Sequence, residues 1–563
     1  MDVAVAKGQA VRTSPRGAAR SSRGRTHWLA ISGFVLLALL VKAPQFVAPM
    51  GQDQGLYHAV AEEILRGSVP YRDAWDPKPP GVFYTHAALL SLMSDPWRVC
   101  QLGSLPGLSH SNLQPRCGTL LFQAVDFAYS LGVGGLVLLV ARRLDFGRSG
   151  EALAFGLTVI FTNLAVLDAE GSTPEKYALG PAVGVVLAGL AGVRTRQRRW
   201  LVLAGVLGAA AALFKLPDLA SFGALSLVLV SLRRGRDLVW LWGACLGVLG
   251  GVTAVFVEMG AGGPFLEATL LYNFGRVSFQ SERIAYAALV SGWQVFRDGL
   301  ALLWLPTLIG AAAAWHAQRW RVLLLWAALD VLALFLGGTK FTREYFLQLV
   351  PSFSLLAVVG LQTLWVGQAR DRLARAWLLL SLAAISLLSG AFQAGFTLRA
   401  WNEYIANGWT TTSAERLAAM VAALPARESL FVWGDEAELY PLSGRLPTTR
   451  FLNTAGLAAN ADPSVKARRS EMIISLTQAP PAVLVVDRRI GTDDPDGRLQ
   501  LNVGYFPELQ QLLADNYRQM DDGVLRAYLG GDREQVFVRQ GGTLDLCAEM
   551  QGCRLIDEGT SLS

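Results

Sequence analysis

The sequence has few of the residues that soluble enzymes and metal proteins commonly use. Charged residues occupy only 17% of its 563 positions, and it contains five histidines and five cysteines. It has no CxxC pair, HExxH motif, Walker loop or GxSxG motif, so it lacks the sequence marks of the enzyme classes that these motifs define. With so few histidines, a histidine-rich metal site is not expected.

Hydrophobic residues, in contrast, make up 52% of the chain, which is more than an ordinary soluble domain contains. This composition is typical of an integral membrane protein. The formal net charge is +6, but the basic residues are spread over short turns between apolar runs. Membrane topology therefore explains them better than a nucleic-acid partner does, and we expect no nucleic acid among the partners.

Roughly eleven apolar runs have the composition of membrane-spanning helices, although several are shorter than the ~17–25 residues of a full crossing. These runs are 28–48, 119–141, 151–167, 178–193, 200–214, 219–232, 238–257, 299–315, 322–337, 345–366 and 377–395. The fourth, fifth and sixth runs are the weakest, and two longer helices are an alternative there. The sequence thus predicts a mainly α-helical fold, with a polytopic bundle over residues 28–400.

Arginines cluster before the first run and in every second loop that follows. The main clusters contain Arg12, Arg16, Arg20, Arg23, Arg25, Arg142, Arg143, Arg148, Arg194, Arg196, Arg198, Arg199, Arg233, Arg234 and Arg236. The positive-inside rule then places the N-terminus in the cytoplasm and, with an odd number of spans, the C-terminal part outside. The apolar run that follows the basic N-terminal residues is about 20 residues long and contains no small-residue cleavage site, so we expect residues 1–27 to be a disordered basic tail before an uncleaved first span.

The long apolar runs stop near residue 400, and residues 401–563 predict an external soluble α/β domain. Short β-type runs alternate there with helical patterns. The strands are expected at 429–434, 482–487 and 534–539, and the helices near 411–424 and 506–517.

Four cysteines fall in segments that this topology places outside. The pairs Cys100–Cys117 and Cys547–Cys553 are close in sequence, and an oxidising compartment favours two disulfides. Free thiols are the alternative. Cys245 lies inside a predicted span, where a small packed side chain is expected.

The first external loop, residues 49–118, begins with a predicted amphipathic helix. From Gln54 to Arg66, the apolar residues Leu56, Val60 and Ile64 recur at helical spacing, so the helix is expected to lie in the membrane interface with its apolar face down.

Asp53 stands where this helix begins, and two interpretations are open. One is an N-cap whose carboxylate accepts backbone N–H groups. The other is a general base at the membrane boundary, kept ionised by the helix N-terminus. The two are compatible.

The stretch YRDAWDPKPPG supplies Tyr71, Asp73, Asp76 and Lys78. The two prolines and the glycine fix a turn that would hold Lys78 in place, where its ammonium suits a phosphate. A lysine whose head reaches the membrane interface is the alternative.

Three later segments carry further candidate residues. The loop LDAEGSTPEKYAL offers Asp168, Glu170 and Glu175. Glu175 is the best placed because it directly precedes a span, although it would also complement a helix dipole. Lys215, which has Asp218 nearby, could bind a phosphate, and so could Lys340 and Arg343, which lie beside Tyr345 in sequence. The alternative is that these residues are ordinary anchors at helix ends.

Two acids lie inside predicted spans, Asp126 and Asp330. Each costs about 2.5–3.5 kcal/mol on insertion scales, so each needs a partner or a cavity. Hydrogen bonds between helices are the commoner explanation, and a proton or substrate pathway is the other.

DQGLYHAVAEEILRGSVPYRDAWDPKPPG and GGTKFTREYFLQLVPSFSLLAVVGL resemble two motifs of the GT-C glycosyltransferases. The resemblance is to the bacterial branch similar to protein mannosyltransferases, lipid A aminoarabinose transferases and rhizobial lipopolysaccharide sugar transferases. It covers roughly residues 28–400 and, more loosely, FVWGDEAELYPLSGRLPTTRF.

The resemblance implies an inverting transferase in the bacterial inner membrane. Its donor would be a polyprenyl-phosphate sugar, its acceptor a lipid, glycan or protein, and its chemistry would take place at the external face. Asp53 matches the first-loop catalytic acid and Lys78 the phosphate-contacting lysine, and Glu175 matches the second acidic motif. Further substrate-binding candidates are Tyr57, Tyr71, Asp76, Lys215, Lys340, Arg343 and Tyr345.

No cofactor is implied with certainty. The family often has a second acid after the first-loop Asp, and Gln54 stands there instead, which weakens the expectation of a divalent metal. The alternative function is a transporter or flippase for lipid-linked glycans. Transporters usually show two related halves, and no internal repeat is visible in this sequence.

Overall fold

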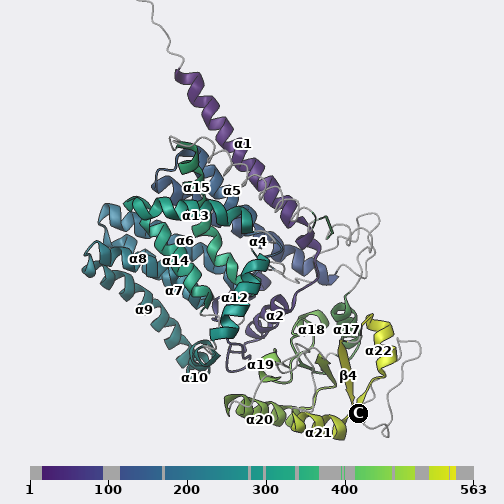
Figure 1. The fold of residues 1–563 in the computed structure, drawn as a ribbon. Helices are drawn as coiled ribbons and strands as arrows, with labels where there is room; N and C mark the ends of the chain where they lie inside the picture. The colour runs from purple at the N-terminus through teal and green to yellow at the C-terminus, as the bar shows by residue number, and fades with distance from the viewer. Residues whose placement is uncertain are drawn as a thin grey trace, which may run out of the picture.

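The computed structural model describes residues 16–92, 114–167, 171–276, 281–295, 300–335, 342–366, 395, 398–399, 412–425, 427–458, 463–487, 506–531 and 533–540. Figure 1 shows a bundle of helices from which α1 projects at one end. The C-terminal residues, coloured green to yellow, lie at the other end.

Every predicted apolar run before residue 367 corresponds to a helix. These helices are α1 (Arg16–Lys42), α4 (Gln114–Arg143), α5 (Gly147–Phe161), α6 (Pro174–Thr195), α7 (Arg198–Phe214), α8 (Ala220–Ser231), α9 (Gly235–Glu258), α13 (Ala301–His316), α14 (Arg321–Leu334) and α15 (Leu349–Val366). The weak runs form three helices rather than two. The run 377–395 falls almost wholly outside the described residues.

By length and composition, five helical stretches in the described part of the chain are able to cross a membrane: Arg25–Phe46, Thr119–Arg143, Pro174–Thr195, Gly235–Glu258 and Arg343–Leu364. The first helix begins at Arg16, so the prediction of a disordered tail is wrong for residues 16–27. Alanine and arginine in that segment are good helix formers, and they extend the helix ahead of its apolar part.

The two acids inside the bundle join neighbouring helices. Asp126 on α4 accepts hydrogen bonds from Lys42 Nζ at 2.7 Å and Lys176 Nζ at 2.6 Å, and all three residues are fully buried. Asp330 on α14 accepts from Ser352 Oγ on α15 at 2.6 Å. These bonds agree with the commoner of the two predicted explanations.

The first loop, predicted to be external, contains α2 (Gln52–Leu65) and α3 (Gly81–Ser91). The helix α2 was predicted to lie on the membrane surface, but residues 54–61 are all buried, polar ones included. It packs against α3 and α18 (Leu439–Ser443). A Cβ at Gly55 would lie 2.4 Å from the Cα of Glu438, so only glycine permits this approach.

A second segment, predicted to be external, follows α9. It contains α10 (Gly262–Leu266), a π-helical turn (Glu267–Leu271), α11 (Tyr272–Arg276) and α12 (Ser281–Val295). The first three pack one after another from the end of α9.

The described residues between 412 and 540 form a unit that we call the C-terminal α/β unit. Its sheet has the strand order β1-β2-β4-β3, with β1 (Leu430–Trp433) and β2 (Val483–Asp487) parallel and β4 (Glu534–Arg539) antiparallel to β2. These strands were predicted. The edge strand β3 (Tyr517–Gln519) was not, because three residues carry no readable alternation.

Helices cover this sheet and connect its strands. They are α17 (Ser413–Ala422), α18, α19 (Ala455–Ala458), α20 (Pro463–Gln478), α21 (Pro507–Asn516) and α22 (Asp522–Leu529). The predicted helices near 411–424 and 506–517 correspond to α17 and α21.

The C-terminal α/β unit shares one hydrophobic core with the first loop and with the segment after α9. Tyr57, Trp75 and Phe83 of the first loop are buried in the same cluster as Phe265 of the second segment and Phe431 of β1. Figure 1 shows α18 beside α2. The first loop is therefore covered by the C-terminal unit, and this cover explains why α2 is buried.

Candidate active site

Asp53 lies in the first turn of α2, but it is not the N-cap. Gly51 occupies the cap position in an extended conformation, and its carbonyl accepts from Gly55 N at 2.8 Å. The Asp53 side chain, 49% exposed, turns instead to the Lys78 ammonium at 3.3 Å. The helix N-terminus still favours its negative charge.

Lys78 is fixed by its backbone as well as by its charge. Its N–H donates to Asp76 Oδ1 at 2.9 Å, and its carbonyl accepts from the Tyr71 hydroxyl at 2.9 Å. Two prolines follow it and restrict the backbone of the turn. The ammonium lies 5.0 Å from the centre of the Tyr57 ring.

Lys78 keeps its positive charge although it is partly buried. Burial by itself lowers the pKa of this lysine, but the carboxylates of Asp53, Asp76 and Glu175 outweigh it. The pKa of Lys78 is therefore raised above its usual value, and the side chain is an ammonium at any physiological pH.

Glu175 forms a second ion pair beside the first. The helix α6 starts with Thr173 as N-cap and Pro174 in its first turn, so Glu175 complements the helix dipole as predicted. Its carboxylate also lies 2.8 Å from Lys215 Nζ. That ammonium sits 3.4 Å from the centre of the Tyr345 ring.

The 3-10 helix Arg343–Gln348 (η9) brings one acid that the sequence analysis missed. Glu344 interacts electrostatically with both Glu175 and Asp53. Glu344 lies between Arg343 and Tyr345 in the motif TREYF. Its place between these two predicted site residues could have identified it as a further candidate. Arg343 itself is exposed at the start of η9.

The structure therefore gathers Asp53, Lys78, Glu175, Lys215 and Tyr345. Tyr57, Tyr71 and Asp76 are buried behind Lys78, where Tyr71 and Asp76 hold its backbone. Asp218 is buried in the 3-10 turn Leu216–Leu219 after Lys215. Asp168, Glu170 and Lys340 lie outside the described residues.

The predicted disulfides are likewise beyond the described part of the chain. Cys100, Cys547 and Cys553 fall in segments that the structure does not describe, and so does the side chain of Cys117. Cys245 is a buried free thiol on α9, in agreement with its expected packing role.

A metal ion does not fit these acids well. Within the described ranges, no group of three or more His, Cys, Asp or Glu side chains is arranged to hold one. Asp53 and Glu175 each face a lysine ammonium, with which a divalent cation would have to compete.

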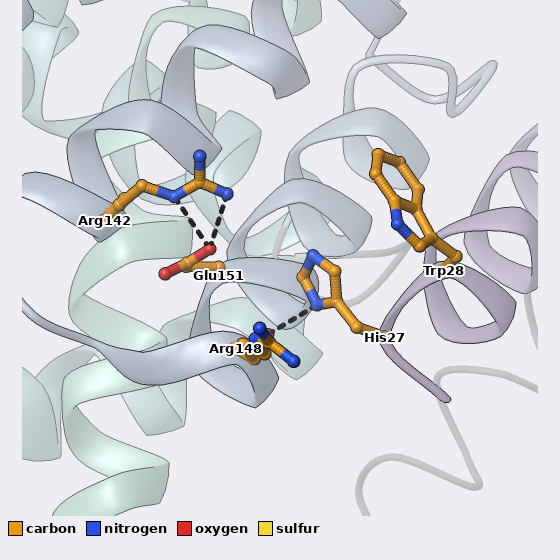
Figure 2. A pocket seen from close by; sticks show the side chains of 5 residues that line it. All are labelled: His27, Trp28, Arg142, Arg148 and Glu151. Atoms are coloured by element: carbon orange, nitrogen blue, oxygen red, sulfur yellow. Dashed lines mark hydrogen bonds and ion pairs between the residues drawn. The ribbon is translucent and has the colours of Figure 1, made fainter. Parts of the chain in front are cut away.

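A cavity of about 390 Å³ lies elsewhere in the bundle (Figure 2). It is lined by His27 and Trp28 of α1, Arg142 of α4, and Arg148 and Glu151 of α5. The Arg142 guanidinium pairs there with Glu151 at 3.0 Å. None of the predicted site residues lines it, so this cavity is separate from the charged cluster.

Together, these observations define a mainly helical membrane protein with a small α/β unit packed over a cluster of acids and lysines. No protein-family model matches the chain, and no curated protein matches it. Two solved structures similar to it are crystal structures of ArnT from Cupriavidus metallidurans, one bound to undecaprenyl phosphate and one in the apo state. The identities are 17% and 16%; each comparison has a TM-score of 0.49 and covers 91% of this chain and 98% of the ArnT chain.

Proposed function

We propose that this chain is an inverting membrane glycosyltransferase that moves a sugar from a polyprenyl-phosphate donor to an acceptor hydroxyl. The observation that carries the proposal is the pairing of Asp53 with Lys78 beside the pair of Glu175 with Lys215. Such a cluster offers a base and phosphate-binding cations within one site. The resemblance of both sequence motifs to the GT-C glycosyltransferases gives the reaction class.

Asp53 is the base in this scheme, because its carboxylate is half exposed and lies at a helix N-terminus. The acceptor oxygen attacks the anomeric carbon of the sugar while its proton passes to Asp53. The bond from that carbon to the phosphate oxygen breaks, and polyprenyl phosphate leaves from the opposite side. One displacement inverts the anomeric configuration.

Lys78 and Lys215 stabilise the negative charge that grows on the departing phosphate. An ammonium has three donors, so Lys78 can keep its bond to Asp53 and still bind a phosphate oxygen. Arg343 and Lys340 are further phosphate contacts in this proposal, and Tyr345 supports Lys215. Glu175 holds Lys215 in position.

We place the reaction at the external face of the bacterial inner membrane, with the N-terminus in the cytoplasm and the C-terminal α/β unit outside. The arginine clusters support this orientation through the positive-inside rule. The acceptor class, whether lipid, glycan or protein, is left open by these residues.

The test is sugar transfer by the purified protein in lipid nanodiscs, using a panel of radiolabelled undecaprenyl-phosphate pentoses and hexoses with membrane extract as acceptor. We expect one donor to be consumed and its product to carry the inverted anomeric configuration by NMR. A retained configuration would exclude the single displacement. Translocation of intact lipid-linked sugar across vesicles, without transfer, would favour the transporter alternative.

A further inference from the structure

Three segments far apart in the sequence meet around Trp75, three residues before Lys78. Trp75 belongs to the first loop, Glu267 to the segment after α9, and Arg468 to α20 of the C-terminal α/β unit. The indole N–H donates to Glu267 Oε2 at 3.3 Å, and the Arg468 guanidinium lies 4.7 Å from the ring centre. Arg468 also pairs with Glu267, so each of these three residues contacts the other two.

Aromatic rings complete this contact. The Trp75 ring lies 5.1 Å from that of Tyr272 and 6.0 Å from that of Phe451, measured between centres. Arg468 stacks on Tyr272 as well, at 4.9 Å. Trp75 is only 4% exposed, so these cation–π and aromatic contacts operate away from water, where they are strongest.

Arg450 reaches the same turn from the segment after α18. Its guanidinium donates to the Tyr71 carbonyl at 2.8 Å, and its own carbonyl accepts from Trp75 N at 2.7 Å. Two bonds to Glu471 on α20 hold the guanidinium in place. A planar guanidinium can donate two parallel bonds to the Glu471 carboxylate and a third to the Tyr71 carbonyl, a geometry that the compact ammonium of a lysine does not match.

The Tyr71 backbone depends on this support. Its φ is +71°, a left-handed conformation that is rare for a bulky residue and persists only where the surrounding structure holds it. The bond from Arg450 to the Tyr71 carbonyl is one such constraint, and the buried ring is another. The Tyr71 hydroxyl in turn bonds the Lys78 carbonyl.

We propose that the C-terminal α/β unit holds the Lys78 turn in its position relative to Asp53, and that Arg450 and Arg468 are positioning residues for sugar transfer. Arg450 acts through Tyr71, while Arg468 acts through Trp75 and the adjacent Asp76, which accepts from Lys78 N. The proposal rests on the proposed function, in which Lys78 meets the donor phosphate. In this proposal the C-terminal α/β unit contributes to catalysis through the position of Lys78 and not through its own contact with substrate.

The experiment compares Arg450→Ala and Arg468→Glu with the wild type in nanodiscs, and adds the charge-swapped pair Arg468→Glu/Glu267→Arg. Arg539→Ala is the matched control, because Arg539 bonds only within the C-terminal unit in the contacts described, to Pro480 and Glu428. Melting temperature reports folding. Hydrogen–deuterium exchange of residues 69–78 reports the turn without depending on any activity.

We expect faster exchange in residues 69–78 for both single variants, with kcat for transfer lowered about tenfold or more and a smaller change in KM. The charge-swapped pair should regain most of both properties, and the control should resemble the wild type. Unchanged exchange in Arg450→Ala and Arg468→Glu would show that the C-terminal α/β unit does not hold the Lys78 turn. Faster exchange with full kcat would overturn the positioning role. A wild type that transfers no sugar would instead overturn the proposed function, and with it the link to catalysis.

Discussion

The Lys78 ammonium lies 3.3 Å from the Asp53 carboxylate although 25 residues separate them in sequence. One residue belongs to the first turn of α2 and the other to the Pro-Pro turn before α3. This pair joins a candidate base to a candidate phosphate contact. A substitution of either residue therefore changes the electrostatics of the other, and the two roles have to be separated by different measurements.

Replacement of Lys78 by methionine should weaken binding of undecaprenyl phosphate. A charge-assisted hydrogen bond contributes about 1.5–3 kcal/mol, which corresponds to a loss of roughly 10- to 100-fold in affinity. The measurement is a lipid-binding titration in detergent. Lys466→Met, at an exposed position on α20, should bind as the wild type does. Equal affinity in Lys78→Met would show that the lysine does not hold the phosphate.

The pair of Glu175 and Lys215 should behave as a unit. Glu175→Gln removes the carboxylate that pairs with the largely buried Lys215 ammonium, and Lys215→Met removes the ammonium that pairs with the Glu175 carboxylate. We expect each single variant to lower kcat/KM for transfer and the double variant to lose no more than the worse single. Residues in such direct contact usually couple by about 0.5–3 kcal/mol. Fully additive losses would show that the two side chains act independently.

Much of this architecture follows from local patterns. Apolar runs of helical length predicted the helices of the bundle, and the β-type runs predicted β1, β2 and β4. The spacing of Asp53 and the Lys78 turn within one quoted motif predicted their common site. In each case the signal lies within a few dozen residues of sequence.

The errors come from contacts that local patterns do not record. An N-cap was one of the two interpretations open for Asp53, but Gly51 takes the cap position, where glycine is also accepted. The helix α2 is buried because α18, almost 400 residues later, covers it. Arg450 bonds the Tyr71 carbonyl across 379 residues, and nothing in either segment alone indicates that contact.

Stability should depend on Asp126, which accepts hydrogen bonds from Lys42 and Lys176 inside the bundle. Asp126→Asn leaves two buried ammonium groups without their carboxylate. Removing one member of a buried ion pair costs about 3–5 kcal/mol, so the melting temperature at a fixed scan rate should fall sharply. The exposed Asp145→Asn is the control. An unchanged melting temperature in Asp126→Asn would contradict the burial of these charges.

The C-terminal α/β unit should lose stability as the pH rises. Burial, followed by the negative charge of Asp487, raises the pKa of Glu436 well above its usual value, and the ion pair with Arg533 at 2.7 Å offsets only part of this rise. The folded chain therefore binds a proton more tightly than the unfolded chain does. This contribution to stability is complete below the unfolded pKa of about 4.3 and is lost as the pH rises through the higher folded pKa.

Glu436→Gln keeps the neutral form of that side chain at every pH. We expect its melting temperature to exceed that of the wild type at about pH 8 and to vary less between about pH 5 and pH 8, since the titrating group is gone. Glu428→Gln, which removes a carboxylate paired with Arg539 on the same unit, is the control. A lower melting temperature for Glu436→Gln at both pH values would mean that the ionised carboxylate stabilises the fold.

The central claim is that Asp53 takes the proton from the acceptor, and single-turnover sugar transfer by Asp53→Asn tests it most directly. The matched control is Glu63→Gln, which removes a carboxylate on the same helix that bonds Arg66 and Ser68. We expect Asp53→Asn to bind undecaprenyl phosphate and yet to transfer sugar about 100-fold or more slowly, while Glu63→Gln transfers normally. Transfer by Asp53→Asn at the wild-type rate would contradict the assignment of Asp53 as the base.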